Sequence, residues 1–193
     1  MWAADWRVYL HLPAAHAPDD IDSALGRALT LGAIGAVEIP LTGLGDQDAA
    51  ALVDHFRAIV HPTGIPLIGF GKARRDILAR LDGVRHASLE EAKQTKSIGD
   101  LTGITVSDNR DDAMTAGTQR PDFLYLDAPA EFVAWWSEVM IVPCVAPIGD
   151  RLSDGAAMLK ARPDMVALDE AAWNHPDGPA GAAMALSGLI ASD

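Results

Sequence analysis

The chain has 193 residues, 49% of them hydrophobic, and a formal net charge of −12. This length predicts one domain with a substantial core, and the hydrophobic content excludes a disordered chain. The acidic balance argues against general binding to nucleic acid or to anionic membranes, and no apolar stretch is long enough to span a bilayer. Cys144 is the sole cysteine. We therefore expect no internal disulfide and a cytoplasmic location, with Cys144 buried in a strand and not catalytic. Residues 1–7 show no basic flank followed by an apolar block, so we expect no signal peptide.

Short runs rich in β-branched residues alternate with amphipathic stretches in the first half of the chain. Strands are predicted over 7–13, 34–41 and 65–70. A helix is predicted to open near Pro18 and Asp19, because an aspartate can cap it and the residues Ile21, Leu25 and Leu29 then share a face. Further helices are predicted to begin at Asp46 and to run over 72–81.

The second half repeats this rhythm. Strands are predicted over 83–86, 103–107, 122–127, 140–146 and 165–169. Helices are predicted to follow Ser88, over 111–116, after Pro129, around 152–159 and over 179–190. Ser88 and Glu91 have the spacing of a capping box, in which the serine caps the helix and the glutamate reaches back. Of the adjacent Trp135 and Trp136, one should pack inward, and the other should face a subunit interface or remain an ordinary, partly covered ring.

The connections between these units are short, and no low-complexity linker separates them. Parallel strands need crossover helices, and about eight such units close a (β/α)₈ barrel. A doubly wound open sheet is the alternative. The near-regular spacing favours a single TIM barrel over residues 1–193.

Several segments resemble the thiamine-phosphate synthase and TenI family. The segments that carry the resemblance are Val8-Tyr-Leu10, Asp82-Gly-Val84, Ile104-Thr-Val-Ser107, Pro121-Asp-Phe-Leu-Tyr125 and Val142-Pro-Cys-Val-Ala146. Their order and spacing cover nearly the whole chain. The resemblance implies a TIM barrel that transfers a pyrimidine from its pyrophosphate to a thiazole phosphate, with Mg²⁺ and several cations holding the leaving group.

The residues of that family's active site are largely replaced in this chain. Its Gln-x-Arg-x-Lys would fall on Glu38-Ile-Pro40-Leu-Thr42, so both cations are missing, and its Asn-Asp-Arg would fall near Lys72-Ala73-Arg74. The resemblance makes Mg²⁺ a candidate cofactor, but its ligands are not evident. Where the family binds phosphate after the last two strands, this chain has Asp150 after Gly149 and Asp169-Glu170, whose carboxylates would repel a phosphate.

Candidate site residues follow the predicted strands, at the edge where ligands bind in parallel barrels. Those predicted to contact a ligand are Lys72, Arg74, Ser107, Gly149 and Asp169, and those predicted to act as acid or base are His11, Glu38 and Asp127. Histidine titrates near neutrality, and three carboxylates could hold a metal or a cationic ring. Solvated surface, helix capping and ion pairing would also explain these residues. His86 is a second candidate for proton transfer.

Two main hypotheses follow from these residues, and a metal-dependent hydrolase or lyase that uses the acidic rim is a third. One is a thiamine-phosphate-synthase-like protein in or near thiamine biosynthesis, whose missing cations argue against ordinary synthase activity. Its partner would be a thiazole or pyrimidine phosphate or a related small molecule, and a homo-oligomer is compatible with it. The alternative is a non-catalytic barrel of the same family that binds a small molecule or a protein.

Overall fold

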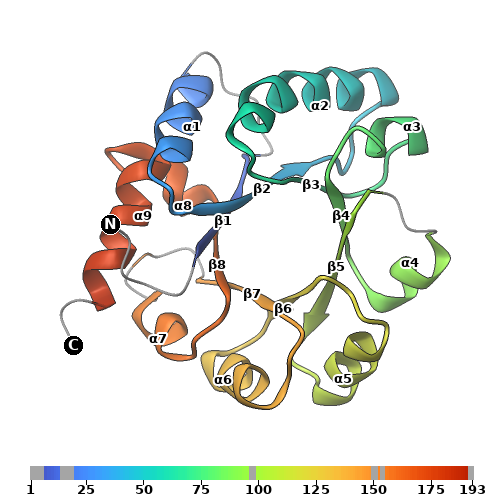
Figure 1. Ribbon diagram of the computed structural model, residues 1–193, viewed down its shortest axis with the longest axis vertical. Helices are drawn as coiled ribbons and strands as arrows, with labels where there is room; N and C mark the ends of the chain where they lie inside the picture. Colours follow the sequence, from blue (N-terminus) through green and yellow to red (C-terminus); the bar gives the residue numbers. More distant parts are fainter. Residues whose placement is uncertain (1–6, 14–19, 96–98, 149–151, 153–154, 191–193) are drawn as a thin grey trace.

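The structure, a computed structural model, describes residues 7–13, 20–95, 99–148, 152 and 155–190. Eight parallel strands within these ranges close into a barrel in sequence order, and β1 completes the ring by pairing with β8 (Figure 1). The strands are β1 (Arg7–His11), β2 (Ile34–Pro40), β3 (Leu67–Phe70), β4 (Gly83–His86), β5 (Leu101–Ser107), β6 (Phe123–Asp127), β7 (Cys144–Pro147) and β8 (Met165–Leu168). The predicted (β/α)₈ barrel is confirmed, and an open sheet is excluded by the β1–β8 pairing.

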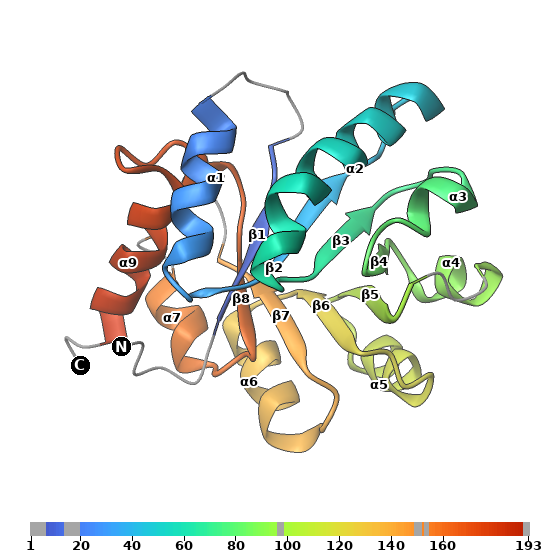
Figure 2. The ribbon, with the colours of Figure 1, turned by 45° about the horizontal axis from the view of Figure 1, so that its top comes forward.

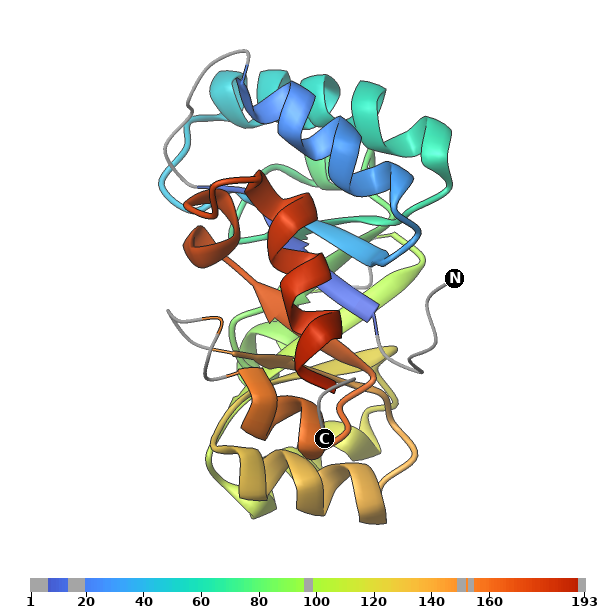
Figure 3. The same cartoon turned by 90° about the vertical axis from the view of Figure 1, so that its left-hand side faces the viewer.

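Helices lie outside the ring of strands (Figure 1). They are α1 (Asp20–Thr30), α2 (Asp46–Val60), α3 (Arg75–Leu78), α4 (Leu89–Gln94), α5 (Arg110–Thr118), α6 (Ala130–Val139), α7 (Gly155–Lys160), α8 (Glu170–Trp173) and α9 (Gly178–Ile190), with a short 3₁₀ turn, η1 (His61–Thr63), after α2. The last helix, α9, packs beside the first, α1, and so joins the two ends of the barrel wall (Figures 2 and 3). No helix in the described part of the chain combines the length and apolar character needed to cross a bilayer.

The apolar residues form two separate cores, because successive side chains of a strand point to opposite faces. One core fills the barrel interior and consists of Tyr9, Ala36, Ile68, Tyr125, Val145 and Ala167. The other lies between the strands and the helices and includes Leu10, Ile39 and Trp136. Gly103 belongs to the interior: a Cβ there would lie 2.2 Å from the Phe123 ring, so only glycine leaves room for that ring. The barrel is therefore a packed core and not a channel.

Several predicted elements are shorter than the sequence pattern indicated, and two of them differ most. The helix predicted over 72–81 is only α3, because the chain leaves β3 through Gly71 at a φ of +110° and Arg74 is still extended. A Cβ on Gly71 would lie 2.7 Å from the backbone nitrogen of Thr42, so only glycine fits where the chain passes that loop. The strand predicted over 140–146 begins only at Cys144, and Ile141 before it is 98% exposed.

The capping signal predicted at Ser88 is present at the start of α4. The Ser88 hydroxyl accepts a hydrogen bond from the Glu91 amide at 3.2 Å, and the Glu91 carboxylate accepts one from the Ala87 amide at 2.7 Å. The capping box is thus confirmed, with its return bond one residue earlier than the motif requires. The predicted start of the first helix at Pro18 and Asp19 lies outside the described residues, while α8 was not predicted.

Candidate functional site

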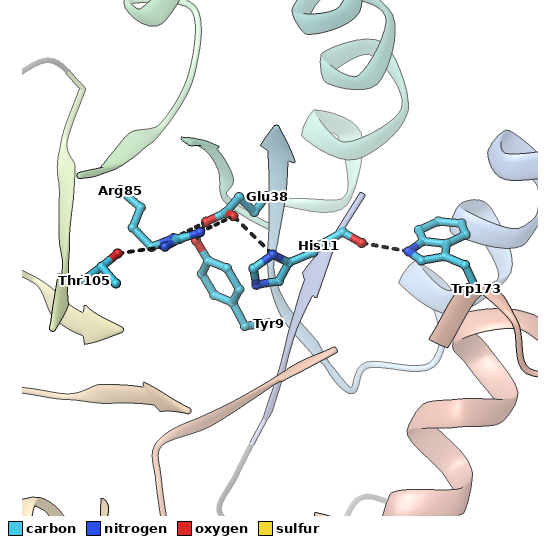
Figure 4. A network of polar contacts seen from close by, with 6 residues as sticks. All are labelled: Tyr9, His11, Glu38, Arg85, Thr105 and Trp173. Atoms are coloured by element: carbon cyan, nitrogen blue, oxygen red, sulfur yellow. Dashed lines mark hydrogen bonds and ion pairs between the residues drawn. The ribbon is translucent and has the colours of Figure 1, made fainter. Parts of the chain in front are cut away.

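A charged network occupies the barrel interior toward the carboxyl ends of the strands (Figure 4). We call this end of the interior the barrel mouth. Glu38 on β2 receives hydrogen bonds from Arg85 of β4 through Nε at 2.6 Å and Nη2 at 2.7 Å, one to each carboxylate oxygen. The Tyr9 hydroxyl of β1 donates a third at 2.6 Å, and His11 Nδ1 lies 3.2 Å from Oε1. Three groups from two other strands thus converge on the Glu38 carboxylate.

Arg85 is held on every side. Its third nitrogen, Nη1, donates to the Thr105 hydroxyl of β5 at 2.7 Å. The rings of Phe70 and Tyr125 lie over the guanidinium, with centroids 3.7 Å and 4.2 Å from Cζ. Arginine between aromatic faces gains cation–π attraction while its edge remains free for hydrogen bonds. The guanidinium is consequently fixed in one orientation, with its edge toward Glu38.

Burial makes this pair the dominant electrostatic feature of the interior, since Glu38 is 2% exposed and Arg85 is 5% exposed. Burial alone would raise the pKa of Glu38, but hydrogen bonds from Arg85 and Tyr9 and the adjacent positive charge outweigh it and lower that pKa. Burial acts to lower the pKa of Arg85, and the contacts with Glu38 raise it instead. Both groups are therefore charged at neutral pH and neutralise one another.

Tyr9 and His11 remain uncharged beside this pair. Burial raises the pKa of the Tyr9 phenol, and the negative charge of Glu38 raises it further. Burial lowers the pKa of His11, an effect that the charge of Glu38 opposes without overcoming. The interior therefore combines one compensated ion pair with a neutral phenol and a neutral imidazole.

The structure brings together only two of the predicted acid and base residues. His11 and Glu38 are register partners on β1 and β2. Asp127 ends β6 beside Ser107 of β5, and both side chains are exposed at the rim of the mouth. Asp169 follows β8, where its side chain caps α8 by accepting a hydrogen bond from the Ala171 amide at 3.3 Å. The carboxylates predicted to act together are thus divided between the interior, the rim and a helix cap.

The predicted cations do not enter the barrel. Lys72 and Arg74 follow β3 and are exposed, and Arg74 forms an ion pair with Asp76 at 3.0 Å. Gly149 lies outside the described residues, as does Asp150. Trp135 is half-buried with Arg110 stacked over its ring at 4.6 Å, which matches the reading of an ordinary partly covered ring, and Trp136 packs inward.

Neither Arg85 nor Tyr9 was predicted as a site residue, and on β4 the adjacent His86 was the predicted candidate in place of Arg85. Strand alternation could have identified Arg85, since His86 faces away from it, toward the helices. There it is 6% exposed and lines a cavity of about 400 Å³ with residues of α4, β5 and the loop after α5. The available signal for Arg85 was a charged residue between Val84 and His86 on a strand of four residues.

The described residues do not fit the Mg²⁺ that the family resemblance implies. Hard cations require several oxygen ligands, and no group of three or more histidine, cysteine, aspartate or glutamate side chains in the described ranges could hold a metal. Both Glu38 oxygens already accept hydrogen bonds from Arg85.

Comparison with known proteins agrees with the fold and the resemblance. No family model matches the chain. Thiamine-phosphate synthase of Rhodospirillum centenum is 31% identical over 92% of this chain and 94% of that protein. Thiamine-phosphate synthase of Hyphomonas neptunium is 33% identical over 48% of each chain. The structure of thiamine phosphate pyrophosphorylase from Pyrococcus furiosus superposes with a TM-score of 0.77 at 18% identity, covering 97% of this chain and 96% of that one. The first relative's identity over almost its full length establishes that the chain belongs to the thiamine-phosphate synthase family.

Proposed function

We propose that the protein binds a thiazole phosphate, a pyrimidine phosphate or thiamine phosphate at the barrel mouth, in or near thiamine biosynthesis, and that it does not catalyse the ordinary synthase reaction. Membership of the family supports the class of ligand. The replaced active-site residues and the geometry of the interior support the loss of the coupling reaction. The alternative, a barrel that binds a protein partner, is an outcome of the test below.

The observation that carries this proposal is the Glu38–Arg85 pair. Catalysis of a pyrophosphate displacement depends on positive charge placed where negative charge develops. Arg85 is the cation inside the described part of the barrel, but its Nε and Nη2 groups already donate hydrogen bonds to Glu38. A pyrophosphate would have to displace a buried carboxylate that makes several hydrogen bonds, and separating such a pair costs about 3–5 kcal/mol.

Lys72 and Arg74, which lie where the family's Asn-Asp-Arg would fall, support binding of a phosphate without turnover. Lys72 is exposed and makes no hydrogen bond or ion pair with the described residues, so a ligand phosphate can reach it without displacing an anion. Arg74 is already paired with Asp76. A solvated lysine attracts a phosphate but stabilises a transition state less than a buried one does, because water screens its charge.

The test measures binding and turnover separately. The coupling of pyrimidine pyrophosphate with thiazole phosphate is assayed with Mg²⁺, with the Rhodospirillum centenum synthase as the positive control. Turnover comparable to that enzyme would refute the proposed loss of activity. The shift of melting temperature with each substrate and with thiamine phosphate measures binding. If neither substrate nor thiamine phosphate shifted the melting temperature, and a pull-down recovered a stoichiometric protein partner, the alternative would be favoured.

Two variants localise the binding. Lys72→Ala should weaken phosphate-ligand binding several-fold, as expected for the loss of a solvent-exposed charge contact. Arg57→Ala removes an exposed cation from the last turn of α2, away from the segment that follows β3, and should leave binding unchanged. Equal effects of the two substitutions would indicate nonspecific attraction and contradict a site at the mouth.

A further inference from the structure

His11 carries a buried atom that the rest of the network does not use. Its Nδ1 faces Glu38 Oε1 at 3.2 Å, whereas its Nε2 is buried without a hydrogen-bond partner in the described part of the chain. A buried polar atom without a hydrogen-bond partner destabilises the folded state, and such atoms are uncommon in folded proteins. It is therefore a position where a ligand atom would recover a lost interaction.

The neighbours of His11 determine which nitrogen carries the proton. Glu38 is ionised and can only accept hydrogen bonds, so the imidazole nitrogen that faces it must be the donor. The neutral ring then holds its proton on Nδ1, and Nε2 presents a lone pair. The network fixes the tautomer before any ligand arrives.

The same neighbours fix the orientation of the ring. The rings of Tyr9 and Tyr125 contact it edge-to-face, with centroids 5.4 Å and 5.6 Å away. The indole of Trp173 on α8 donates to the His11 carbonyl at 2.7 Å and so anchors the end of β1 (Figure 4). A histidine held at its ring, its Nδ1 and its backbone is pre-organised for one contact, that of Nε2.

The charged groups around His11 restrict what can approach it. Glu38 and Arg85 neutralise one another, so the negative charge of Asp169 is the uncompensated charge acting on the ring among the described groups. An anionic group is disfavoured near this carboxylate, whereas a neutral or cationic donor is not. The complementary ligand group is an N–H or O–H on a neutral or cationic heterocycle, and any phosphate it carries has to lie elsewhere.

We infer that Nε2 of His11 is the atom that accepts a hydrogen bond from the heterocyclic part of the ligand, and that Glu38, held by Arg85 and Tyr9, is its positioning residue. This inference rests on the proposed function for the identity of the ligand. Thiamine phosphate is a suitable probe, because its aminopyrimidine carries N–H donors and its thiazolium is cationic. Asp127 has no part in this arrangement.

The tautomer is tested on the protein without ligand. Nitrogen-15 spectra of histidine-labelled protein, with His11 assigned by its loss in His11→Asn, should show a protonated Nδ1 and an unprotonated Nε2 at pH 7.5. In Glu38→Gln the preference for the Nδ1–H tautomer should weaken, because a neutral amide is a poorer acceptor than a carboxylate. A protonated Nε2 in the unaltered protein would overturn the inference.

Two substitutions at the same position separate the roles of the two nitrogens. In His11→Asn the side-chain amide can still donate to Glu38 where Nδ1 does, but nothing replaces Nε2. In His11→Gln the longer amide places an oxygen acceptor near the position of Nε2 and loses the donor to Glu38. We expect His11→Asn to retain the melting temperature within a few degrees and to weaken thiamine phosphate binding about tenfold or more. We expect His11→Gln to lose stability and retain more of the affinity.

The outcomes distinguish this inference from the proposed function. Unchanged affinity of His11→Asn for thiamine phosphate would overturn the inference and leave the proposed function standing. If the unaltered protein bound neither thiamine phosphate nor either substrate, the proposed function would fail. The inferred role of Nε2 in ligand binding would then fail with it, and the ligand-free spectra would still decide the tautomer.

Discussion

The buried pair Glu38–Arg85 permits a quantitative test of how the interior is stabilised. In Glu38→Gln the guanidinium keeps one acceptor oxygen, but the new amide group faces donors from Arg85 and Tyr9. In Arg85→Met the carboxylate keeps only Tyr9 and His11. Each substitution leaves a buried charge without its partner, for which losses of about 3–5 kcal/mol in the free energy of unfolding are expected.

Arg85→Met should cost more than Glu38→Gln. The arginine also loses its contacts with the rings of Phe70 and Tyr125, at 3.7 Å and 4.2 Å, and desolvated cation–π contacts are worth about 2 kcal/mol. The double variant removes both charges at once, so no unpaired charge remains. Its loss should therefore be smaller than the sum of the single losses by about 2 kcal/mol or more.

Urea denaturation of the four proteins at pH 7.5, followed by circular dichroism, supplies the double-mutant cycle. The pair Arg74–Asp76 provides a matched control, because its nitrogen–oxygen distance is 3.0 Å but its side chains are 62% and 56% exposed. Its coupling energy should be below about 1 kcal/mol. A coupling below about 0.5 kcal/mol for Glu38–Arg85, or one no larger than the control, would refute the assignment of this pair as the electrostatic centre of the barrel.

Three further predictions concern titration and reactivity. Tyr9 and Tyr125 are the two tyrosines of the chain, and burial raises the pKa of each above its usual 10.0. The tyrosinate absorbance at 295 nm should therefore stay flat through pH 10 and rise only on unfolding. The free energy of unfolding should decrease as the pH rises above 10, because the unfolded state loses these protons first. Burial lowers the pKa of His11 from 6.5, so the folded state binds fewer protons than the unfolded state. The free energy of unfolding, measured by urea denaturation, should therefore fall as the pH drops below about 6.5. This part of the pH dependence should be weaker in His11→Asn. The Cys144 thiol is fully buried and burial raises its pKa, so a thiol reagent should modify it at the rate of protein opening and not at the rate for an exposed cysteine.

The sequence alone determined the architecture. Strand β4 was placed over the residues that form it, the other strands were placed approximately, and the capping box at Ser88 was identified with its partner Glu91. These features depend on local chemistry: β-branched runs, amphipathic spacing and side-chain caps act over a few residues. The start of α3 was mispredicted because the chain after β3 turns through Gly71 at a φ of +110° beside Thr42 of another loop, and Arg74 is still extended.

Only the tertiary structure decided the chemistry of the interior. Glu38, His11 and Arg85 were all visible in the sequence, but Arg85 lies 47 positions from Glu38, and its role follows from the closure of eight strands around it. Barrel closure sets which side chains point inward and at what height they meet, and this register is a property of the whole ring. A glutamate that looked available for catalysis is instead the counter-ion of a buried arginine, and the histidine beside it retains the one unpaired buried side-chain nitrogen or oxygen in the described part of the chain.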